Sequence, residues 1–117
     1  MIQTRDQNKN FSFKRATDGV WHITPAYDFT FSVDTSAPGY INRHCMTINN
    51  KNADIERADL LQIAKRYNIK GAESIINKAV DIVSNYAHYA QLANIDEHWT
   101  NKIVEEISYR IGVLNVR

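Results

Sequence analysis

The stretch FSFKRATDGVWHI, residues 11–23, contains two short β-prone runs with a turn signal between them. Aromatic residues alternate with polar ones in the first run, and VWHI forms the second. Asp18 and Gly19 lie between the runs, and an Asp-Gly pair favours a hairpin because the turn needs positive φ angles at its central residues. Pro25 ends the second run, since proline cannot donate to a strand ladder. The stretch therefore predicts a β-hairpin with a two-residue turn.

The predicted turn fixes which residues of the two strands face each other. With a two-residue turn, Phe13 faces Thr24. The same count places Asn10 opposite Tyr27, one residue before Asp28. An amide and a carboxylate are therefore expected side by side at the open end of the hairpin.

Beyond the hairpin, the sequence changes near residue 54 from short alternating runs to long runs with helical spacing. Segment 33–43 contains a Pro-Gly pair and small polar residues, which predicts a surface loop. One more short strand is expected at 44–48, ending at Asn49 and Asn50. No internal repeat or low-complexity segment is visible.

The apolar spacing of the second part predicts three helices. The first runs from near Ile55 to Asn68, and the second, expected to be the longest, runs from near Gly71 to about Ala90. The second has a wide apolar arc, which predicts a helix covered on more than one side. The third is expected to begin after Asp96 as its N-cap. The aromatic residues on helical spacing are predicted to pack in the core: Tyr67, Tyr86, Tyr89 and Trp99.

Length and composition limit the class of protein. At 117 residues and 13.5 kDa, the chain has the size of one domain, residues 1–117. We expect an α+β fold in which the hairpin and a short strand pack on a mainly helical core. The net charge of +1 gives no global field that would favour direct nucleic-acid binding or an anionic membrane. No stretch approaches the ~20 apolar residues that span a bilayer.

Common catalytic and metal motifs are not present in the sequence. The four histidines are scattered without zinc-ligand spacing, so we expect them at the surface. The single cysteine, Cys45, is expected to be a partly buried thiol, and with no opening apolar run we expect a cytoplasmic chain. Neither a P-loop nor a G-x-G-x-x-G motif occurs.

The open end of the predicted hairpin carries the remaining candidate site. Asn10 and Asp28 are expected there, and Asp6 precedes Asn10 by four residues. Oxygen ligands of this kind suit Mg²⁺, which proteins usually hold through one or two carboxylates together with substrate phosphates. The pattern indicates a phosphoryl-transfer site, although Asp and Asn also occur at strand ends as turn formers and caps.

Two segments beside the hairpin carry a family resemblance. DQNKNFSF at 6–13 and WHITPAYDFTFS at 21–32 resemble the catalytic loop and metal-binding segment of the HipA-like serine/threonine kinases, the toxin halves of bacterial toxin–antitoxin pairs. The likeness continues through HCMTINNKNADIERADLLQIAKRYNI at 44–69, which is similar to that family's short strand, N-K turn and following helix. The K-N-F-S-F and P-A-Y-D-F elements together make it fairly specific.

The resemblance implies roles for four residues. Asn10 matches the catalytic-loop asparagine that binds Mg²⁺, and Asp28 matches the aspartate that stands where other protein kinases have D-F-G. Lys9 matches a basic residue of the same loop, and Asp6 is the candidate base that accepts the substrate hydroxyl proton. ATP and Mg²⁺ are the implied cofactors of the intact kinase.

The loop departs from the family pattern at two positions. The family reads N-x-D-x-H-x-K-N, with five steps from the catalytic aspartate to the metal asparagine, whereas Asp6 and Asn10 are four apart. An ungapped alignment puts Arg5 at the base position and Gln7 at the histidine position. Either one residue is deleted and Asp6 serves, or the base has been lost.

The resemblance also implies which part of a kinase this is. In this family the ATP-binding residues lie upstream of the catalytic loop, and the chain begins almost at that loop. We therefore expect a C-terminal lobe without its N-lobe, inactive alone because phosphoryl transfer needs positioning from both lobes, unless the missing lobe acts in trans. The implied partners are a HipB-like DNA-binding antitoxin and a protein substrate of the translation machinery.

Two other hypotheses remain beside the kinase. A non-catalytic interaction module derived from such a kinase is favoured by Arg5, by Gln7 and by the missing upstream half. A small metal-binding or hydrolytic protein would use Asp6 and Asp28.

Overall fold

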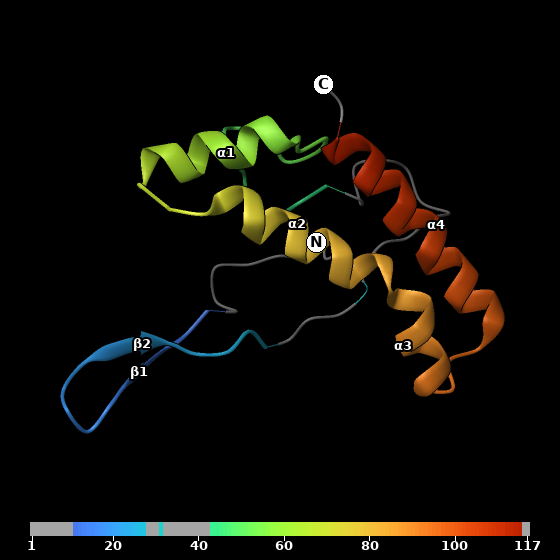
Figure 1. Cartoon of the computed structure of the whole chain (residues 1–117), viewed down its shortest axis with the longest axis horizontal. Coiled ribbons are helices and arrows are strands. Elements are labelled where there is room, and N and C mark those ends of the chain that lie inside the picture. Colours follow the sequence, from blue (N-terminus) through green and yellow to red (C-terminus); the bar gives the residue numbers. More distant parts are fainter. Residues whose placement is uncertain (1–10, 28–30, 32–42, 116–117) are drawn as a thin grey trace. The chain divides into compact units, whose positions relative to one another are not determined.

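The computed structural model describes residues 11–27, 31 and 43–115, and within these ranges it contains one two-stranded antiparallel sheet followed by four helices (Figure 1). The predicted α+β class is therefore confirmed. The chain divides into two units, residues 1–46 with the hairpin and residues 47–117 with the helices. The expectation of a single domain stays a prediction.

The hairpin is built from β1, Phe13–Arg15, and β2, Trp21–Ile23. Phe13 pairs with Ile23, and Arg15 pairs with Trp21. Because alternate residues of a strand share a face, these two pairs lie on one face of the sheet, and Lys14 and His22 form the pair on the other.

The predicted register of this hairpin is wrong by one residue, because the turn contains three residues instead of two. The backbone N–H of Ala16 donates to Val20 O at 2.8 Å, and that of Gly19 donates to Ala16 O at 3.0 Å. Gly19 has a φ of 86°, in the left-handed region. A turn that is closed by a left-handed glycine is the usual three-residue hairpin loop. Phe13 consequently faces Ile23 rather than Thr24.

The helices are α1, Arg57–Arg66; α2, Ala72–Ser84; α3, Tyr86–Leu92; and α4, Glu97–Leu114. Helix α1 packs on α2, and α4 returns along α3 and α2 (Figure 1). The helix expected at 71–90 is thus two helices, and the longest described helix is α4.

The break between α2 and α3 lies at Asn85. Its side-chain Nδ2 donates to the backbone O of Asp81 at 2.9 Å, which is the carbonyl that the Asn85 N–H would bond in a regular helix. The Asn85 N–H instead donates to Ile82 O at 3.2 Å, a tighter turn. A side chain that competes for a backbone acceptor therefore explains why the apolar spacing runs on while the helix does not.

Two helices end on left-handed asparagines. Asn68 follows α1 with a φ of 53°, and Asn94 follows α3 with a φ of 52°. After each, an isoleucine N–H reaches back to a helix carbonyl: Ile69 to Ala64 at 2.8 Å and Ile95 to Ala90 at 2.9 Å. Both ends are Schellman motifs, with asparagine where glycine is more usual.

The predicted N-cap of the last helix is confirmed. The side chain of Asp96 accepts hydrogen bonds from the backbone N–H groups of His98, at 2.9 Å, and Trp99, at 3.4 Å. An aspartate here satisfies two donors that have no partner inside the helix.

The short strand expected at 44–48 is not formed. Ile48 and Lys51 exchange two backbone hydrogen bonds of 2.9 Å each across a tight turn, and no longer ladder follows. Asn49 and Asn50 occupy the turn with φ angles of 55° and 64°. Two positive φ angles define a type I′ turn, which asparagine tolerates well. The loop expected at 33–43 lies outside the described residues apart from Arg43.

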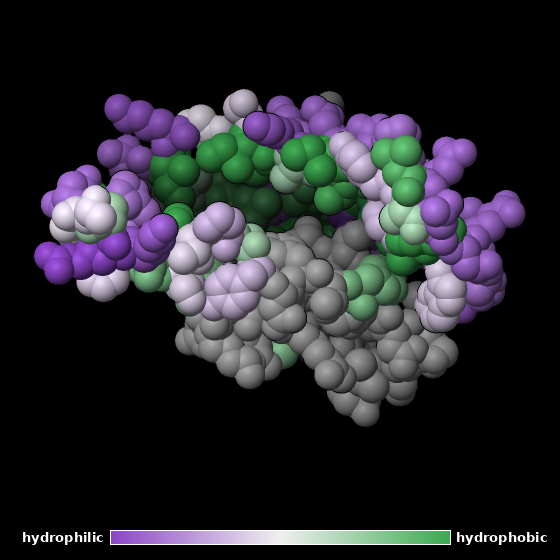
Figure 2. All heavy atoms as spheres, turned by 90° about the horizontal axis from the view of Figure 1, so that it is seen from below, coloured by the Kyte–Doolittle hydropathy of each residue, from purple (hydrophilic) through white to green (hydrophobic). Residues whose placement is uncertain are grey.

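The core of the helical unit is small. Among the described residues, the buried hydrophobic side chains are Ala64, Ile76, Ala90, Ile103 and Ile107. Figure 2 shows hydrophobic side chains gathered on one face of the helices, with hydrophilic ones along the outer edge. None of the helices that the structure describes combines the length and apolar character needed to cross a bilayer.

Several residues expected in this core are exposed. Tyr67 is 67% exposed, Tyr89 is 53% exposed and Trp99 is 54% exposed. Helix α2 packs against both α1 and α4, and its Ile76 is buried, whereas Ile75 on the neighbouring stripe remains exposed. Helical spacing therefore identified apolar stripes correctly but not which of them is covered.

Candidate functional site

The four residues predicted to form the kinase site lie outside the described residues. These are Asp6, Lys9, Asn10 and Asp28. The count that placed Asn10 opposite Tyr27 rested on the two-residue turn, and the observed register removes that argument. Their roles stay predictions that follow from the resemblance.

Two described residues close to these positions come together at the open end of the hairpin. Ser12 lies two residues after Asn10, and Tyr27 lies one residue before Asp28. The Ser12 Oγ and the Tyr27 OH are 2.7 Å apart, a hydrogen bond in which either can donate. The backbone N–H of Thr24 donates to Ser12 O at 2.9 Å, so the pairing continues past the strands. Two segments that each lead to a predicted site residue are therefore joined here.

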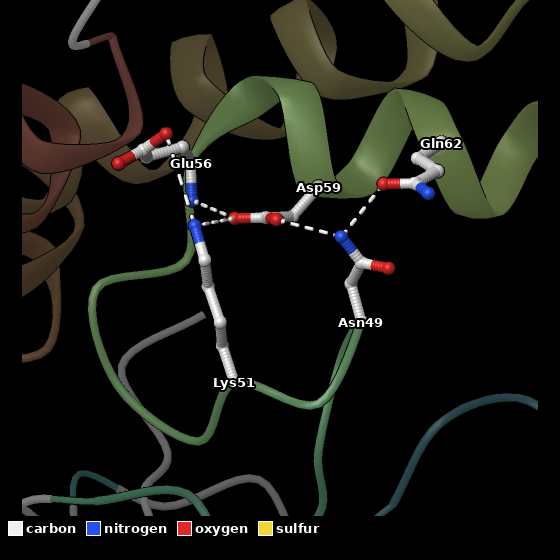
Figure 3. A network of polar contacts seen from close by, with 5 residues as sticks. All are labelled: Asn49, Lys51, Glu56, Asp59 and Gln62. Atoms are coloured by element: carbon white, nitrogen blue, oxygen red, sulfur yellow. Dashed lines mark hydrogen bonds and ion pairs between the residues drawn. The ribbon is translucent and has the colours of Figure 1, made fainter.

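The most developed polar cluster in the described structure surrounds Asp59 on α1 (Figure 3). Lys51 Nζ donates to Asp59 Oδ2 at 2.8 Å, and Asn49 Nδ2 donates to Asp59 Oδ1 at 3.0 Å. The backbone N–H of Glu56 also donates to Asp59 Oδ2, at 3.0 Å. Asn49 Nδ2 further contacts Gln62 Oε1 at 2.7 Å. We call Asn49, Lys51, Glu56, Asp59 and Gln62 the Asp59 network.

The local sequence builds this network from a turn and a helix start. The type I′ turn turns the chain back at Asn49 and Asn50, so that Asn49 and Lys51 both reach toward α1 (Figure 3). Asp59 occupies the third position of α1, from which an acidic side chain can reach back to the N-cap N–H, here that of Glu56. One carboxylate therefore both caps the helix and holds the turn.

The network strongly favours the ionised form of Asp59. The hydrogen bonds from Lys51, from Asn49 and from the Glu56 N–H together lower the pKa of Asp59 from 3.8 to about 2. Conversely, the hydrogen bond to Asp59 raises the pKa of Lys51 above its ordinary value. The Asp59 side chain is buried, whereas that of Lys51 is 41% exposed. The buried charge of the pair is therefore the Asp59 carboxylate, and hydrogen-bond donors surround it.

The Asp59 network stabilises the local structure and is poorly suited to acid–base catalysis. Both oxygens of the Asp59 carboxylate accept hydrogen bonds from protein donors, and its pKa is far from that of a general base at neutral pH. No buried side-chain nitrogen or oxygen among the described residues lacks a hydrogen-bond partner. The Asp59 network therefore fixes the turn at 48–51 on α1.

A second cluster ties the ends of three helices through Arg57. Arg57 Nη1 donates to Glu73 Oε2 on α2 and to Asn77 Oδ1, both at 2.9 Å. Its Nη2 donates to Asn115 Oδ1 at 3.1 Å, just after α4. One planar guanidinium thus fixes the start of α1 against α2 and the end of α4.

The remaining titratable candidates show no assembled site in the described part of the chain. His22, His88 and His98 are exposed, as expected. Cys45 is also exposed, so the prediction of a partly buried thiol is wrong. No three His, Cys, Asp or Glu side chains gather as metal ligands within residues 11–27, 31 and 43–115.

Sequence reasoning did not find the Asp59 network. Its signals were present: an Asn-Asn pair suited to positive φ angles, and an acidic residue three positions after Glu56 at the start of an apolar helical run. The contacts of Asn49 and Lys51 with α1 span ten and eight residues, and neither propensity nor periodicity reports such contacts.

Comparison with known proteins gives no relative: no protein-family model, no curated protein and no solved structure matches this chain.

Proposed function

We propose that the chain carries the catalytic-loop and Mg²⁺-binding segments of a HipA-like serine/threonine kinase toxin, arranged as part of a kinase C-terminal lobe. The observation that carries the proposal is the 2.7 Å contact between Ser12 and Tyr27. It joins the segment that follows Asn10 to the segment that precedes Asp28, which a shared metal site at those two residues requires.

A second support comes from the segment 44–69, which shares in the resemblance. Its N-K turn and the helix after it form one unit through the Asp59 network. The resemblance in segment 44–69 therefore includes residues that contact one another in the structure, in addition to matching in sequence.

The chemistry of such a site follows from the residue types. Asn10 and Asp28 would hold Mg²⁺, which neutralises charge on the transferring phosphoryl group of ATP, and Lys9 would add positive charge nearby. Asp6 would accept the proton of the substrate hydroxyl. The protein substrate belongs to the translation machinery in this proposal, the partner is a HipB-like DNA-binding antitoxin, and the compartment is the cytoplasm.

The 117-residue polypeptide tested alone should transfer phosphate at a negligible rate. Its sequence has no P-loop or G-x-G-x-x-G motif, and phosphoryl transfer depends on positioning of ATP from both lobes. Incubation with radiolabelled ATP and Mg²⁺ tests this. Autophosphorylation or peptide phosphorylation at ordinary kinase rates would refute it.

Calorimetric titration of the chain with Mg²⁺ and ATP tests the site itself. We expect weak binding that Asp28→Ala and Asn10→Ala both abolish, while Glu105→Gln, an exposed carboxylate on α4, leaves it unchanged. Absence of binding in a folded sample would contradict a formed metal site. It would leave the kinase resemblance without a function in this polypeptide.

The alternative is a non-catalytic interaction module derived from such a kinase. The exposure of large apolar side chains favours it, because surfaces of this kind mark binding sites. In that case Asn10→Ala and Asp28→Ala would leave partner binding unchanged. Co-purification of the wild-type chain and the double variant with a co-expressed HipB-like antitoxin tests this alternative, and loss of the antitoxin from the double variant would contradict it.

A further inference from the structure

The loop between β1 and β2 contains the one Asp-Gly step of the sequence, Asp18 and Gly19 (Figure 1). No Asn-Gly step occurs in the sequence. Asp18 is exposed and Gly19 is half-buried. Water therefore reaches this step, and the tip of a hairpin is a place where a chain opens easily.

An aspartate before a glycine can rearrange its own backbone, because glycine has no side chain to shield the attacking nitrogen. The backbone nitrogen of Gly19 bonds to Cγ of Asp18, and the carboxyl hydroxyl leaves with the amide proton as one water molecule. The product is a five-membered succinimide ring. Water then adds its hydroxyl to the main-chain carbonyl carbon of Asp18 and its proton to the nitrogen, and the bond between these two atoms breaks. The chain now continues through Cγ as isoaspartate, with its mass unchanged.

The closed hairpin engages both reacting groups. The backbone N–H of Gly19 donates to Ala16 O at 3.0 Å, and Asp18 Oδ1 accepts a hydrogen bond from the backbone N–H of Val20 at 2.9 Å. The succinimide nitrogen carries no proton, so the bond from Gly19 to Ala16 must break before the ring closes. The reaction should consequently proceed from the opened loop and be slow in the closed one.

The isoaspartyl product does not fit the same loop. It adds one methylene group, about 1.5 Å, to the main chain between Asp18 and Gly19. The bonds that close the three-residue loop, from Gly19 N–H to Ala16 O and from Ala16 N–H to Val20 O, both span this position. A hairpin of two strands is marginally stable even with a well-fitting loop. The modified hairpin should therefore stay open.

We propose that Asp18 is a site of spontaneous isomerisation to isoaspartate, a modification that occurs when the hairpin opens and then prevents the hairpin from closing. Water is the only other reactant. The contact between Ser12 and Tyr27 depends on the same hairpin, so it is lost with it. The modification is independent of the proposed kinase function and can be measured without any activity.

Peptide mapping of the aged full chain tests the site. The chain is kept at neutral pH and physiological temperature, unfolded in urea and digested with endoproteinase Asp-N, which cuts before aspartate but not before isoaspartate. We expect progressive loss of the cut before Asp18 without a change of mass. The cut before Asp28, which a phenylalanine follows, is the internal control and should persist.

A variant that opens the hairpin tests the protection by the closed loop. Phe13→Gly together with Ile23→Gly removes the side chains of one cross-strand pair and leaves Asp18 and Gly19 unchanged. Isomerisation should then be about tenfold faster than in wild type, because the rate follows the open fraction of a marginally stable hairpin. Tyr67→Ala is the control, since this exposed tyrosine lies outside the hairpin, and the rate should not change.

Three outcomes would overturn the proposal. If the cut before Asp18 persists in both wild type and the double-glycine variant, Asp18 is not an isomerisation site. Equal rates in these two proteins overturn the protection by the closed loop. Nuclear Overhauser contacts between Phe13 and Ile23 in the purified isoaspartyl form overturn the loss of the hairpin.

Discussion

At the level of single residues, Asp59 joins the turn at 48–51 to the start of α1. It caps α1 through the Glu56 N–H and holds the preceding turn through Asn49 and Lys51. Because the hydrogen bonds reach an ionised carboxylate, each is stronger than one between neutral groups. The stability of the turn should therefore depend on the charge of this one group.

Asp59→Asn should lower the free energy of unfolding by about 2 kcal/mol at pH 7. The pKa of Asp59 in the folded chain, about 2, lies below the ordinary 3.8, so the stabilisation is complete above about pH 4 and is lost as the pH falls toward 2. Urea unfolding of wild type and variant from pH 7 to pH 2 measures it. Glu105→Gln is the control. A wild-type advantage that is unchanged at pH 2 would show that ionisation is not its cause.

Lys51 and Asp59 should be coupled. Lys51→Met and Asp59→Asn each break the same 2.8 Å contact, so the double variant should lose less stability than the two single variants added together. Urea unfolding of the four proteins gives the coupling. As a control, Lys51→Met combined with Asp96→Ala should be additive, since these residues belong to separate contacts. Strict additivity in the first cycle would contradict a direct interaction.

At the level of elements, the hairpin shows which features of a strand pair local sequence can predict. The Asp-Gly signal identified the hairpin and its position correctly. It could not distinguish a two-residue turn from a three-residue turn, because Gly19 adopts a positive φ in both. The observed bond from Gly19 N–H to Ala16 O decides the longer loop and moves every cross-strand pair by one.

Gly19→Ala should destabilise this hairpin by about 1 kcal/mol. Its φ of 86° is unfavourable for a residue with a Cβ, although the space around the new Cβ is sufficient, with Arg15 Nη2 at 3.4 Å. Nuclear Overhauser contacts between Phe13 and Ile23 report hairpin formation. Thr17→Ala, in the same turn, should leave them unchanged. Equal loss in both variants would indicate general turn sensitivity rather than backbone strain.

The start of α4 is also predictable from sequence, and its cap can be tested. Asp96→Ala should cost about 1 kcal/mol of unfolding free energy, because the His98 and Trp99 N–H groups lose their acceptor. Asp96→Ser should keep most of the stability, since a serine oxygen can accept the same bonds. Thermal unfolding compares them. Serine that costs as much as alanine would contradict the capping role.

The break at Asn85 and the exposed aromatic residues were not predictable by the same means. The apolar period continues unchanged through residues 71–90, so periodicity predicts one helix. The competing hydrogen bond from the Asn85 side chain does not alter the spacing of the apolar residues. Likewise, Tyr67 and Trp99 have core-like spacing, but only the packing of the other helices decides which stripe is covered. The predicted site residues lie outside the described ranges, so sequence remains their basis.

At the level of the whole molecule, the two units differ in what stabilises them. All five buried hydrophobic residues of the described chain and the Asp59 network belong to residues 47–117. A peptide of residues 47–117 should therefore keep the helical circular dichroism of the full chain. Its unfolding should be cooperative but of low free energy, because so small a core contributes little. A featureless spectrum of this peptide would contradict an autonomous helical unit.

The asparagines that end α1 and α3 have a consequence for how this sequence can diverge. Each of those ends is specified by bonds within six residues, from Ala64 to Ile69 and from Ala90 to Ile95. Helix boundaries that are encoded so locally do not depend on which apolar side chains fill the core. Homologous sequences could therefore exchange much of their interior and surface over evolutionary time and still keep the same outline of helices, provided that Asn or Gly stays at positions 68 and 94.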